Sequence, residues 1–421
     1  MDHPSSPPAP GSRPGLPPRL VDQPEQLAAV VEACASAPRI ALDIEGNGLY
    51  AYRSRLCVLQ LGWLEGDQVA VAIVDPLALP VAPLGDLLGS AGPVKVLHDL
   101  TFDARMLTEA GVELGNVRDT SVAARFLGEP ATGLGALVLA RLGIELDKQL
   151  QDHDWAQRPF TDGQLAYLAG DVRHLLALED ELTRSAEEQR IAAEVAVECR
   201  YKLAGALAPP QDQRPSHLRL KGYADLGNPG RAVARRLVML RDDLAETADV
   251  PPFRIAPNAL LVVLARRKPR DAGQLRKCCG NRRRLPGDPE QWLAAVRLGL
   301  DDGVPPAPEQ AAATPTAVSG REIALRKRLS RALSTWRRKE AKQREVDAQV
   351  VLPGHCVGPL VRELATPSAP AGAGLHARLA AVDGLGDCRL QRYERTWCAL
   401  AEEVEAAVGR SLEEEGKGTA S

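Results

Sequence analysis

Two acidic side chains end the first long apolar stretch of the chain. Asp43 and Glu45 follow directly on apolar residues 40–42, and glycines come at positions 46 and 48. In a β-strand, residues i and i+2 point to the same side, so both carboxylates should project into one site. Neighbouring carboxylates repel and raise each other's pKa unless a cation compensates. The pair therefore predicts a site for a hard divalent cation, although a strand end with two solvated acids has the same pattern.

Three further residues downstream suit the same site. Residues 94–98 predict a second buried strand, and the helix that follows carries Asp103 on its first turn, near the end of that strand. A later amphipathic helix over residues 164–176 carries Tyr167 and Asp171, which are four positions apart and therefore on one face. Four carboxylates and a tyrosine, from two strand ends and two helices, predict a two-metal site.

These residues resemble the three motifs of the DEDDy 3′→5′ exonucleases. The motifs are Asp-x-Glu at 43–45, His-Asp-x-x-x-Asp at 98–103 and Tyr-x-x-x-Asp at 167–171. Residues 142–159 are also similar to the segment before the third motif in the ribonuclease D family. The resemblance covers about residues 20–207, with order and spacing intact. It implies an α/β ribonuclease H-like exonuclease domain, in which helices flank a mixed sheet.

The resemblance also implies a chemistry and its residues. Phosphodiester bonds would be hydrolysed with two divalent metal ions, Mg²⁺ or Mn²⁺, and nucleoside 5′-monophosphates released. By analogy, Asp43 would bridge the ions, Glu45 and Asp171 would complete the site of the attacking water, and Asp103 would support the leaving group. Tyr167 would orient the water, because its ordinary pKa of about 10 suits that role better than the role of a base. All-oxygen ligands disfavour zinc.

Residues beside the motifs are candidates for substrate binding. Tyr50, Tyr52, Arg53 and Arg55 follow the acidic pair, where they would hold a phosphate and stack a terminal base, or only cover the edge of the sheet. His98 begins the second motif. Because histidine is an uncommon magnesium ligand, we interpret it as a substrate-side or structural residue.

The surrounding pattern predicts the sheet that carries the acidic pair. Strands at 56–63 and 69–75, joined by a turn at Gly66 and Asp67, extend the first strand into an antiparallel meander. A helix near 83–88 then leads to a parallel strand at 94. Asp119 stands just ahead of another helix, where an acid more often caps free amides than binds a metal. We therefore predict a structural role for it.

Length and composition predict several domains. The 421 residues exceed one ordinary core, and 45% hydrophobic with 25% charged residues describe a soluble globular protein without a membrane span. Eight cysteines without C-x-x-C spacing fit a reduced cytoplasmic protein. Two C-terminal segments resemble all-α HRDC bundles, the second less closely. The predicted organisation is a disordered tail at 1–19, the exonuclease domain at 20–207, a linker at 208–229, an HRDC domain at 230–300, a linker at 301–320, a second HRDC-like domain at 321–409 and a tail at 410–421.

The resemblance of residues 142–159 to ribonuclease D and the HRDC-like segments imply an RNA substrate. Net charge is only −3, but basic clusters at 266–270, 276–277, 282–284 and 321–344 suit phosphates, or are solvated helix faces. The leading hypothesis is a monomeric ribonuclease D-like exoribonuclease that trims the 3′ ends of tRNA and other small structured RNA precursors. A DNA 3′→5′ exonuclease in repair and a catalytically inactive RNA-binding module are the alternatives. Gly46, where phenylalanine is usual in the family, weakens the assignment of the natural substrate.

Overall fold

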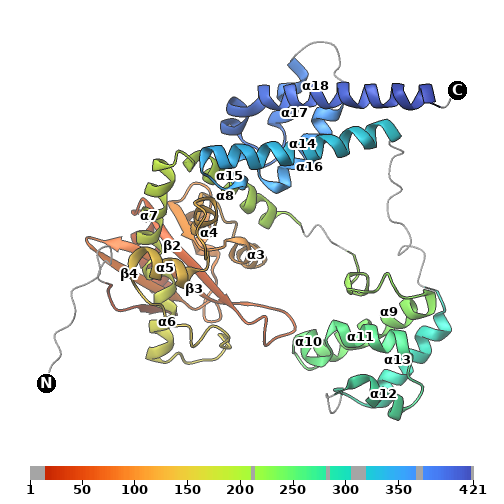
Figure 1. The fold of residues 1–421 in the computed structure, drawn as a ribbon. Coiled ribbons are helices and arrows are strands. Elements are labelled where there is room, and N and C mark those ends of the chain that lie inside the picture. The colour runs from red at the N-terminus through yellow and green to blue at the C-terminus, as the bar shows by residue number, and fades with distance from the viewer. Residues whose placement is uncertain (1–14, 210–213, 281–284, 305–318, 367–372, 419–421) are drawn as a thin grey trace.

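The computed structural model describes residues 15–209, 214–280, 285–304, 319–366 and 373–418. Figure 1 shows an α/β region in red to yellow, a helical bundle in green and a second helical region in blue. Most of the predicted N-terminal tail, residues 1–14, lies outside the described residues. In the described parts of the chain, no helix is long and apolar enough to cross a membrane.

One mixed sheet of six strands forms the α/β region, in the order β1-β4-β3-β2-β5-β6. The strands are β1 (Arg19–Val21), β2 (Arg39–Gly46), β3 (Leu56–Glu65), β4 (Gln68–Val74), β5 (Val94–Leu97) and β6 (Val117–Asp119). The antiparallel pairs β2–β3 and β3–β4 confirm the predicted meander, and β5 pairs with β2 in parallel. The tail prediction was wrong at Arg19, which pairs with Ala72 in β1. A three-residue strand is too short for alternation to reveal it.

Helices cover both faces of the sheet. They are α1 (Pro24–Ala35), η1 (Ala82–Leu84), α2 (Gly85–Leu88), α3 (Thr101–Glu109), α4 (Thr120–Phe126), α5 (Leu134–Leu142), α6 (Asp162–Arg173), α7 (Leu175–Glu188) and α8 (Ala192–Leu207). In β2, Leu42 and Ile44 pack in the core with α1 and α3, whereas Ala41 packs in the core with α6. Because side chains alternate along a strand, Asp43 and Glu45 share the α6 face with Ala41.

A helical bundle follows the α/β region. It contains η2 (Ser216–Arg219), α9 (Asn228–Thr247), α10 (Pro252–Ile255), α11 (Asn258–Arg267), α12 (Ala272–Cys279) and α13 (Pro289–Asp302), packed around Trp292. The predicted linker at 208–229 was too long, because Leu220, Tyr223 and Leu226 are buried in this core. Their regular spacing of three was hidden among proline, glycine and polar residues. Residues 210–213 lie outside the described residues.

The second helical region has its own core around Trp397. Its helices are α14 (Gly320–Arg344), α15 (Ala348–Val351), α16 (Gly354–Ala365), α17 (Ala373–Ala380) and α18 (Asp387–Gly418). Helix α18 continues to Gly418, so most of the predicted tail at 410–421 is helical. The region is attached to α8, where Arg392 donates to the buried Glu194 at 2.7 Å and His355 stacks on Tyr201 at 3.7 Å between ring centroids.

Candidate active site

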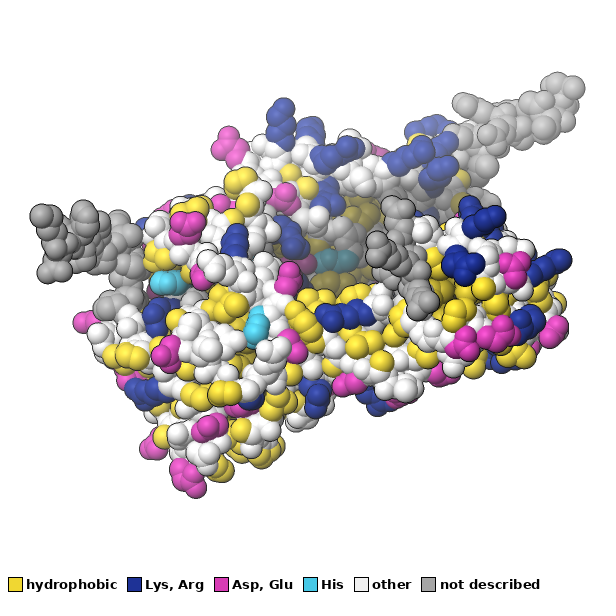
Figure 2. Space-filling view, turned by 90° about the horizontal axis from the view of Figure 1, so that it is seen from below, with side chains coloured by type: hydrophobic (Ala, Val, Ile, Leu, Met, Phe, Trp, Pro, Cys, Tyr) yellow, Lys and Arg dark blue, Asp and Glu magenta, His cyan; other side chains and the backbone are white. Residues whose placement is uncertain are grey.

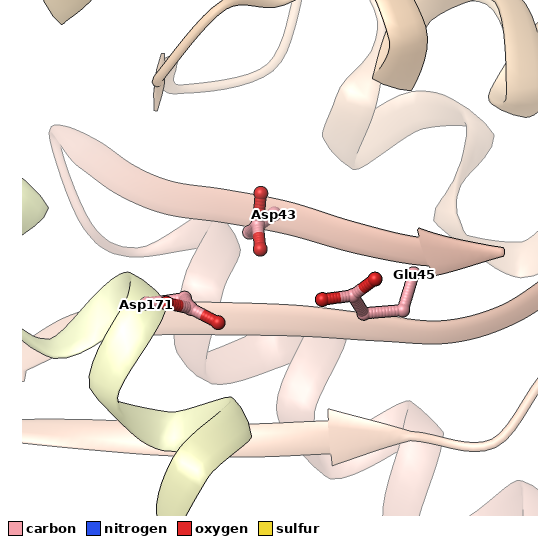
Figure 3. A group of neighbouring side chains, drawn as sticks. All are labelled: Asp43, Glu45 and Asp171. Atoms are coloured by element: carbon pink, nitrogen blue, oxygen red, sulfur yellow. The ribbon is translucent and has the colours of Figure 1, made fainter. Parts of the chain in front are cut away.

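Three carboxylates from β2 and α6 converge at one end of the sheet. Ligand oxygens of Asp43, Glu45 and Asp171 lie within 4.8 Å of one another, and no second group of this kind occurs in the described chain. Figure 3 shows Asp43 and Glu45 projecting from β2 and Asp171 from α6 around a common space. The pairing of β2 with β3 shifts register between Glu45 and Gly46, and such a bulge re-aims the side chains beside it.

Asp103 lies near enough to raise the pKa of Asp43 but is not one of the three acids whose oxygens converge. It lies on the first turn of α3, as predicted, and only 4% of its surface is exposed. Its Oδ2 atom is buried and has no hydrogen-bond partner in the described residues. A buried polar oxygen without a partner is costly, so a missing ligand such as an ion or a water is the natural explanation.

Burial, and then repulsion between neighbouring carboxylates, raise the pKa values of these acids. Burial and the neighbouring Asp171 raise the pKa of Glu45 to about 8, and burial raises the pKa of Asp171 to about 7. The pKa of Asp43 lies well above its ordinary value because of burial and then because of Asp103, Asp171 and Glu45. A divalent cation would remove this penalty, since it favours the charged form of each ligand. Both the donor set and the unpaired oxygen of Asp103 therefore fit a hard cation.

Tyr167 lies one helical turn before Asp171 and lines the same pocket. Burial, followed by the charges of Asp171 and Glu45, raises the pKa of its hydroxyl above the ordinary value, so the group stays protonated at neutral pH. Its ring stacks on the buried Trp155, with 5.8 Å between ring centroids and 28° between the planes. The position of the hydroxyl therefore depends on Trp155, which our sequence reasoning did not single out.

Hydrogen bonds of Arg158 attach the segment around Trp155 to the sheet. Its guanidinium donates to both carboxylate oxygens of Asp75, at 2.6 and 2.7 Å, and to the carbonyl of Trp155 at 2.6 Å. A further bond reaches the carbonyl of Cys57 at 2.8 Å. Both Trp155 and Arg158 belong to residues 142–159, the segment similar to ribonuclease D. Their contacts show that Trp155 supports the ring of Tyr167 and that Arg158 binds Asp75.

Asp119 and Lys202 fix the start of the helix that carries Asp103. The Asp119 carboxylate caps α4, as predicted, and also accepts from the amides of Asp99 and Leu100 at 3.0 and 3.2 Å. Lys202 of α8 donates to Asp119 at 2.9 Å and to Asp99 at 2.7 Å. No sequence pattern links Lys202 to the site, because it lies 83 residues after Asp119.

A pocket of about 340 Å³ is lined by four of the five catalytic candidates, and Asp103 is not among its lining residues. His98 lines it together with Asp43, Glu45, Tyr167 and Asp171, and α5 and residues 146–151 form the opposite wall. The His98 ring nitrogen Nδ1 lies 2.9 Å from the hydroxyl of Thr120, and burial lowers the pKa of the ring. A neutral imidazole at this place can hydrogen-bond a substrate without competing for the cation.

The other four predicted substrate residues do not line this pocket. The Tyr50 hydroxyl donates to the backbone carbonyl of Asp152, and the guanidinium of Arg254 lies 4.7 Å from its ring centre. Tyr52 and Arg53 face the helical bundle instead, and Arg55 is exposed. The four residues therefore lie outside the catalytic pocket, and their role in substrate binding stays a prediction.

Comparisons with known proteins identify both an exonuclease domain and an HRDC domain in this chain. Residues 18–187 match a family model described as 3′-5′ exonuclease, and residues 230–285 match the HRDC domain. Ribonuclease D of Jannaschia sp. (strain CCS1) is 30% identical over 270 residues, which cover 62% of this chain and 68% of the relative. Ribonuclease D of Acidiphilium cryptum is 31% identical over 276 residues, covering 62% and 67%.

A solved structure extends the comparison to almost the whole chain. The crystal structure described as Escherichia coli RNase D, an exoribonuclease involved in structured RNA processing, superposes with a TM-score of 0.63. The match covers 92% of this chain and 99% of the other, at 21% identity. The two proteins therefore share their fold.

Proposed function

The chain belongs to the ribonuclease D family of 3′→5′ exoribonucleases, and from this premise we propose that it trims the 3′ ends of tRNA and other small structured RNA precursors. Each turnover would release a nucleoside 5′-monophosphate. The observation that carries the proposal is the convergence of Asp43, Glu45 and Asp171 beside Tyr167 in one pocket. Its volume of about 340 Å³ is at the small end of ligand pockets, which suits one terminal nucleotide.

The exonuclease domain of this family depends on metal, and we propose two divalent ions, Mg²⁺ or Mn²⁺, held by Asp43, Glu45, Asp103 and Asp171. Carboxylate oxygens are the ligands that these hard cations prefer. Divalent ions supply Lewis-acid activation of the phosphodiester and of water, and they stabilise charge on the departing oxygen. The unpaired oxygen of the buried Asp103 supports its place in the ligand set.

Side chains of the pocket would position the attacking water and the terminal nucleotide. We assign the Tyr167 hydroxyl to holding the attacking water in line with phosphorus, supported by its protonated state and by the Trp155 stack. A fixed ring keeps the hydroxyl in place without further loss of side-chain entropy when substrate binds. We assign His98 to a contact with the terminal nucleotide. We assign Tyr50 a structural role, because its hydroxyl is already bonded to Asp152 and its ring already packs against Arg254.

The helical regions would hold the body of the RNA. We assign residues 19–207 to the exonuclease domain, 216–302 to an HRDC domain and 320–409 to a second HRDC-like domain, supported by their separate cores. At 100° per residue, seven exposed basic side chains of α14 fall within an arc of about 120°. They are Arg321, Lys327, Arg328, Arg331, Arg338, Lys339 and Lys342. Figure 2 shows several Lys and Arg side chains along the upper edge of the molecule in this view. Such a stripe suits the phosphates of an RNA stem.

We propose that the protein works as a monomer in the cytoplasm. No disulfide occurs in the described parts of the chain, and four of the eight cysteines are buried, which suits a reducing compartment. Light scattering should give the monomer mass of 45.1 kDa.

Single-nucleotide gels of a 3′-extended tRNA precursor and a matched DNA oligomer test the proposal. Each would be incubated with Mg²⁺, Mn²⁺ or EDTA, with Asp43→Asn as the inactive control. We expect metal-dependent shortening of the RNA that stops near the stem, because a paired 3′ end does not thread into the pocket. Preferential digestion of DNA would support the repair exonuclease instead. Binding of RNA without digestion would leave only a binding module.

A further inference from the structure

The loop between β2 and β3, residues 47–55, lines one cavity and contacts a segment next to the catalytic pocket. On one side, its Tyr50 is bonded to Asp152, which adjoins Gln151 of the catalytic pocket. On the other side, Tyr52 and Arg53 line a cavity of about 720 Å³ that also contacts η2, α9 and α10. Figure 1 shows this loop reaching toward α10. We call the second space the loop cavity.

The helical bundle is attached along this same loop. The amide of Tyr52 donates to Asp249 at 3.1 Å, and Arg53 pairs with Glu246 at 3.2 Å. Arg254 of α10 lies over the Tyr50 ring. The loop therefore forms one wall of the loop cavity, and the bundle forms the other.

The loop cavity is lined by more positive than negative charge. Three arginines and one acid, Asp242, line it. Buried Arg241 is already paired with Asp242 at 3.0 Å and hydrogen-bonded to Asn258 at 2.6 Å.

The other two arginines are available to a ligand. Arg53 has 83% of its side chain exposed, and a surface pair such as the one with Glu246 is weak enough for a phosphate to replace it. Arg219 is exposed and bonded only to a hydroxyl, that of Ser216 at 3.3 Å, in the described contacts. Two guanidinium groups can therefore bind anions.

An exposed aromatic side chain stands beside these arginines. Phe253 of α10 lines the loop cavity and has 50% of its surface exposed. Aromatic rings next to guanidinium groups are typical of sites for single-stranded RNA, where a base stacks and phosphates are neutralised. The volume lies within the range of about 300–1,000 Å³ that is usual for ligand pockets.

We propose that the loop cavity is a second RNA subsite, which holds single-stranded nucleotides upstream of the terminal one. Arg53 and Arg219 bind phosphates there, and a base stacks on Phe253. The inference rests on the proposed function, since the ligand is the strand whose 3′ end occupies the catalytic pocket. Glu45 and Tyr52 are seven residues apart, which limits their separation to about 25 Å, so one short strand reaches both cavities.

The test measures the length advantage, which is the ratio of kcat/KM for a single-stranded RNA octamer to kcat/KM for a dinucleotide. Arg219→Gln and Phe253→Ala should each lower this ratio about tenfold, the effect of losing one charge-assisted contact or one stacked base. For Arg219→Gln, the slope of log KM for the octamer against log salt should also become shallower by about 0.7, as expected for one lost contact to a single strand. Both substituted side chains are exposed, so the variants should fold.

Lys221→Gln is the matched control. This exposed lysine lies two residues from Arg219 but does not line the loop cavity, so the length advantage should not change. An unchanged ratio and salt slope in Arg219→Gln and Phe253→Ala would overturn the subsite. An equal loss on dinucleotide and octamer would do the same, because it would indicate a general structural effect. If the wild-type protein shortened neither RNA, the proposed function itself would fail.

Discussion

Lys202 donates a hydrogen bond to Asp119 at 2.9 Å, and through Asp119 it holds the amides at the start of α3. The same helix that carries Lys202 also carries Glu194, the attachment point of the C-terminal helices. One helix thus contacts both the C-terminal region and the support of Asp103. The site is therefore fixed by parts of the chain well outside its motifs.

Replacement of Lys202 by methionine should destabilise the fold and loosen the site. Removal of one partner from a buried ion pair typically costs about 3–5 kcal/mol, and Lys202 is partly exposed, so we expect about 3 kcal/mol in urea unfolding at pH 7. Asp103 should then be held less firmly, and the Kd for Mn²⁺ should rise about tenfold. Lys202→Arg should retain most of both properties. Unchanged Mn²⁺ binding in Lys202→Met would contradict the support role.

The stability difference between wild type and Lys202→Met should depend on pH. Burial favours the neutral form of Asp119, but Lys202 and the hydrogen-bond donors outweigh burial and hold its pKa below the ordinary value. A carboxylate with a lowered pKa in the folded state stabilises the fold above its unfolded pKa of about 4 and loses that effect as pH falls. Urea unfolding should therefore show the full difference at pH 7 and a much smaller one near pH 3.

Replacement of Tyr167 by phenylalanine should slow chemistry without releasing metal. The hydroxyl touches the attacking water in our account, so kcat should fall about 100-fold, whereas KM and Mn²⁺ affinity should change less than threefold. Single-turnover kinetics with saturating Mn²⁺ would measure this. A full-rate Tyr167→Phe variant would remove Tyr167 from the mechanism.

The metal-free protein should lose stability as pH rises. Glu45 and Asp171 have folded pKa values of about 8 and about 7, above their unfolded values near 4, so ionisation between about pH 4 and 8 opposes folding. In EDTA the Tm should fall across this range, and saturating Mn²⁺ should flatten the dependence by compensating the charge. Parallel curves with and without Mn²⁺ would argue against a cation among these acids.

Charge reversal on α14 should weaken binding of structured RNA only. Arg331→Glu combined with Arg338→Glu should raise KM for a tRNA precursor about tenfold or more at low salt and much less at high salt, because phosphate contacts are screened. A single-stranded octamer, which has no stem for α14 to bind, serves as the matched substrate. Equal effects on both substrates would indicate damage to the fold.

Local sequence patterns were sufficient for the acids and for most of the sheet. Alternation in β2 placed Asp43 and Glu45 on one face, and a spacing of four placed Tyr167 and Asp171 on one side of α6. The capping role of Asp119 also followed from its position ahead of a helix. These features depend on residues close together in the chain, which is where periodicity and capping rules are reliable.

Features that depend on distant contacts could not be predicted in this way. Lys202 and Trp155 support the site through residues 83 and 12 positions away, and neither belongs to a periodic pattern. Tyr52 and Arg53 were predicted beside the acids, but the turn after Gly48 carries them to the helical bundle. Strand β1 was missed because its three residues form a strand only by pairing with β4.

Calorimetric titration of metal-free protein with Mn²⁺, in the presence of a nucleoside 5′-monophosphate, tests the central claim most directly. We predict two ions for each wild-type chain, and loss of at least one in Asp43→Asn, because Asp43 is one of the three acids whose ligand oxygens converge. Loss of Mn²⁺-dependent RNA shortening should accompany it. Equal Mn²⁺ binding by the wild type and Asp43→Asn would contradict the account.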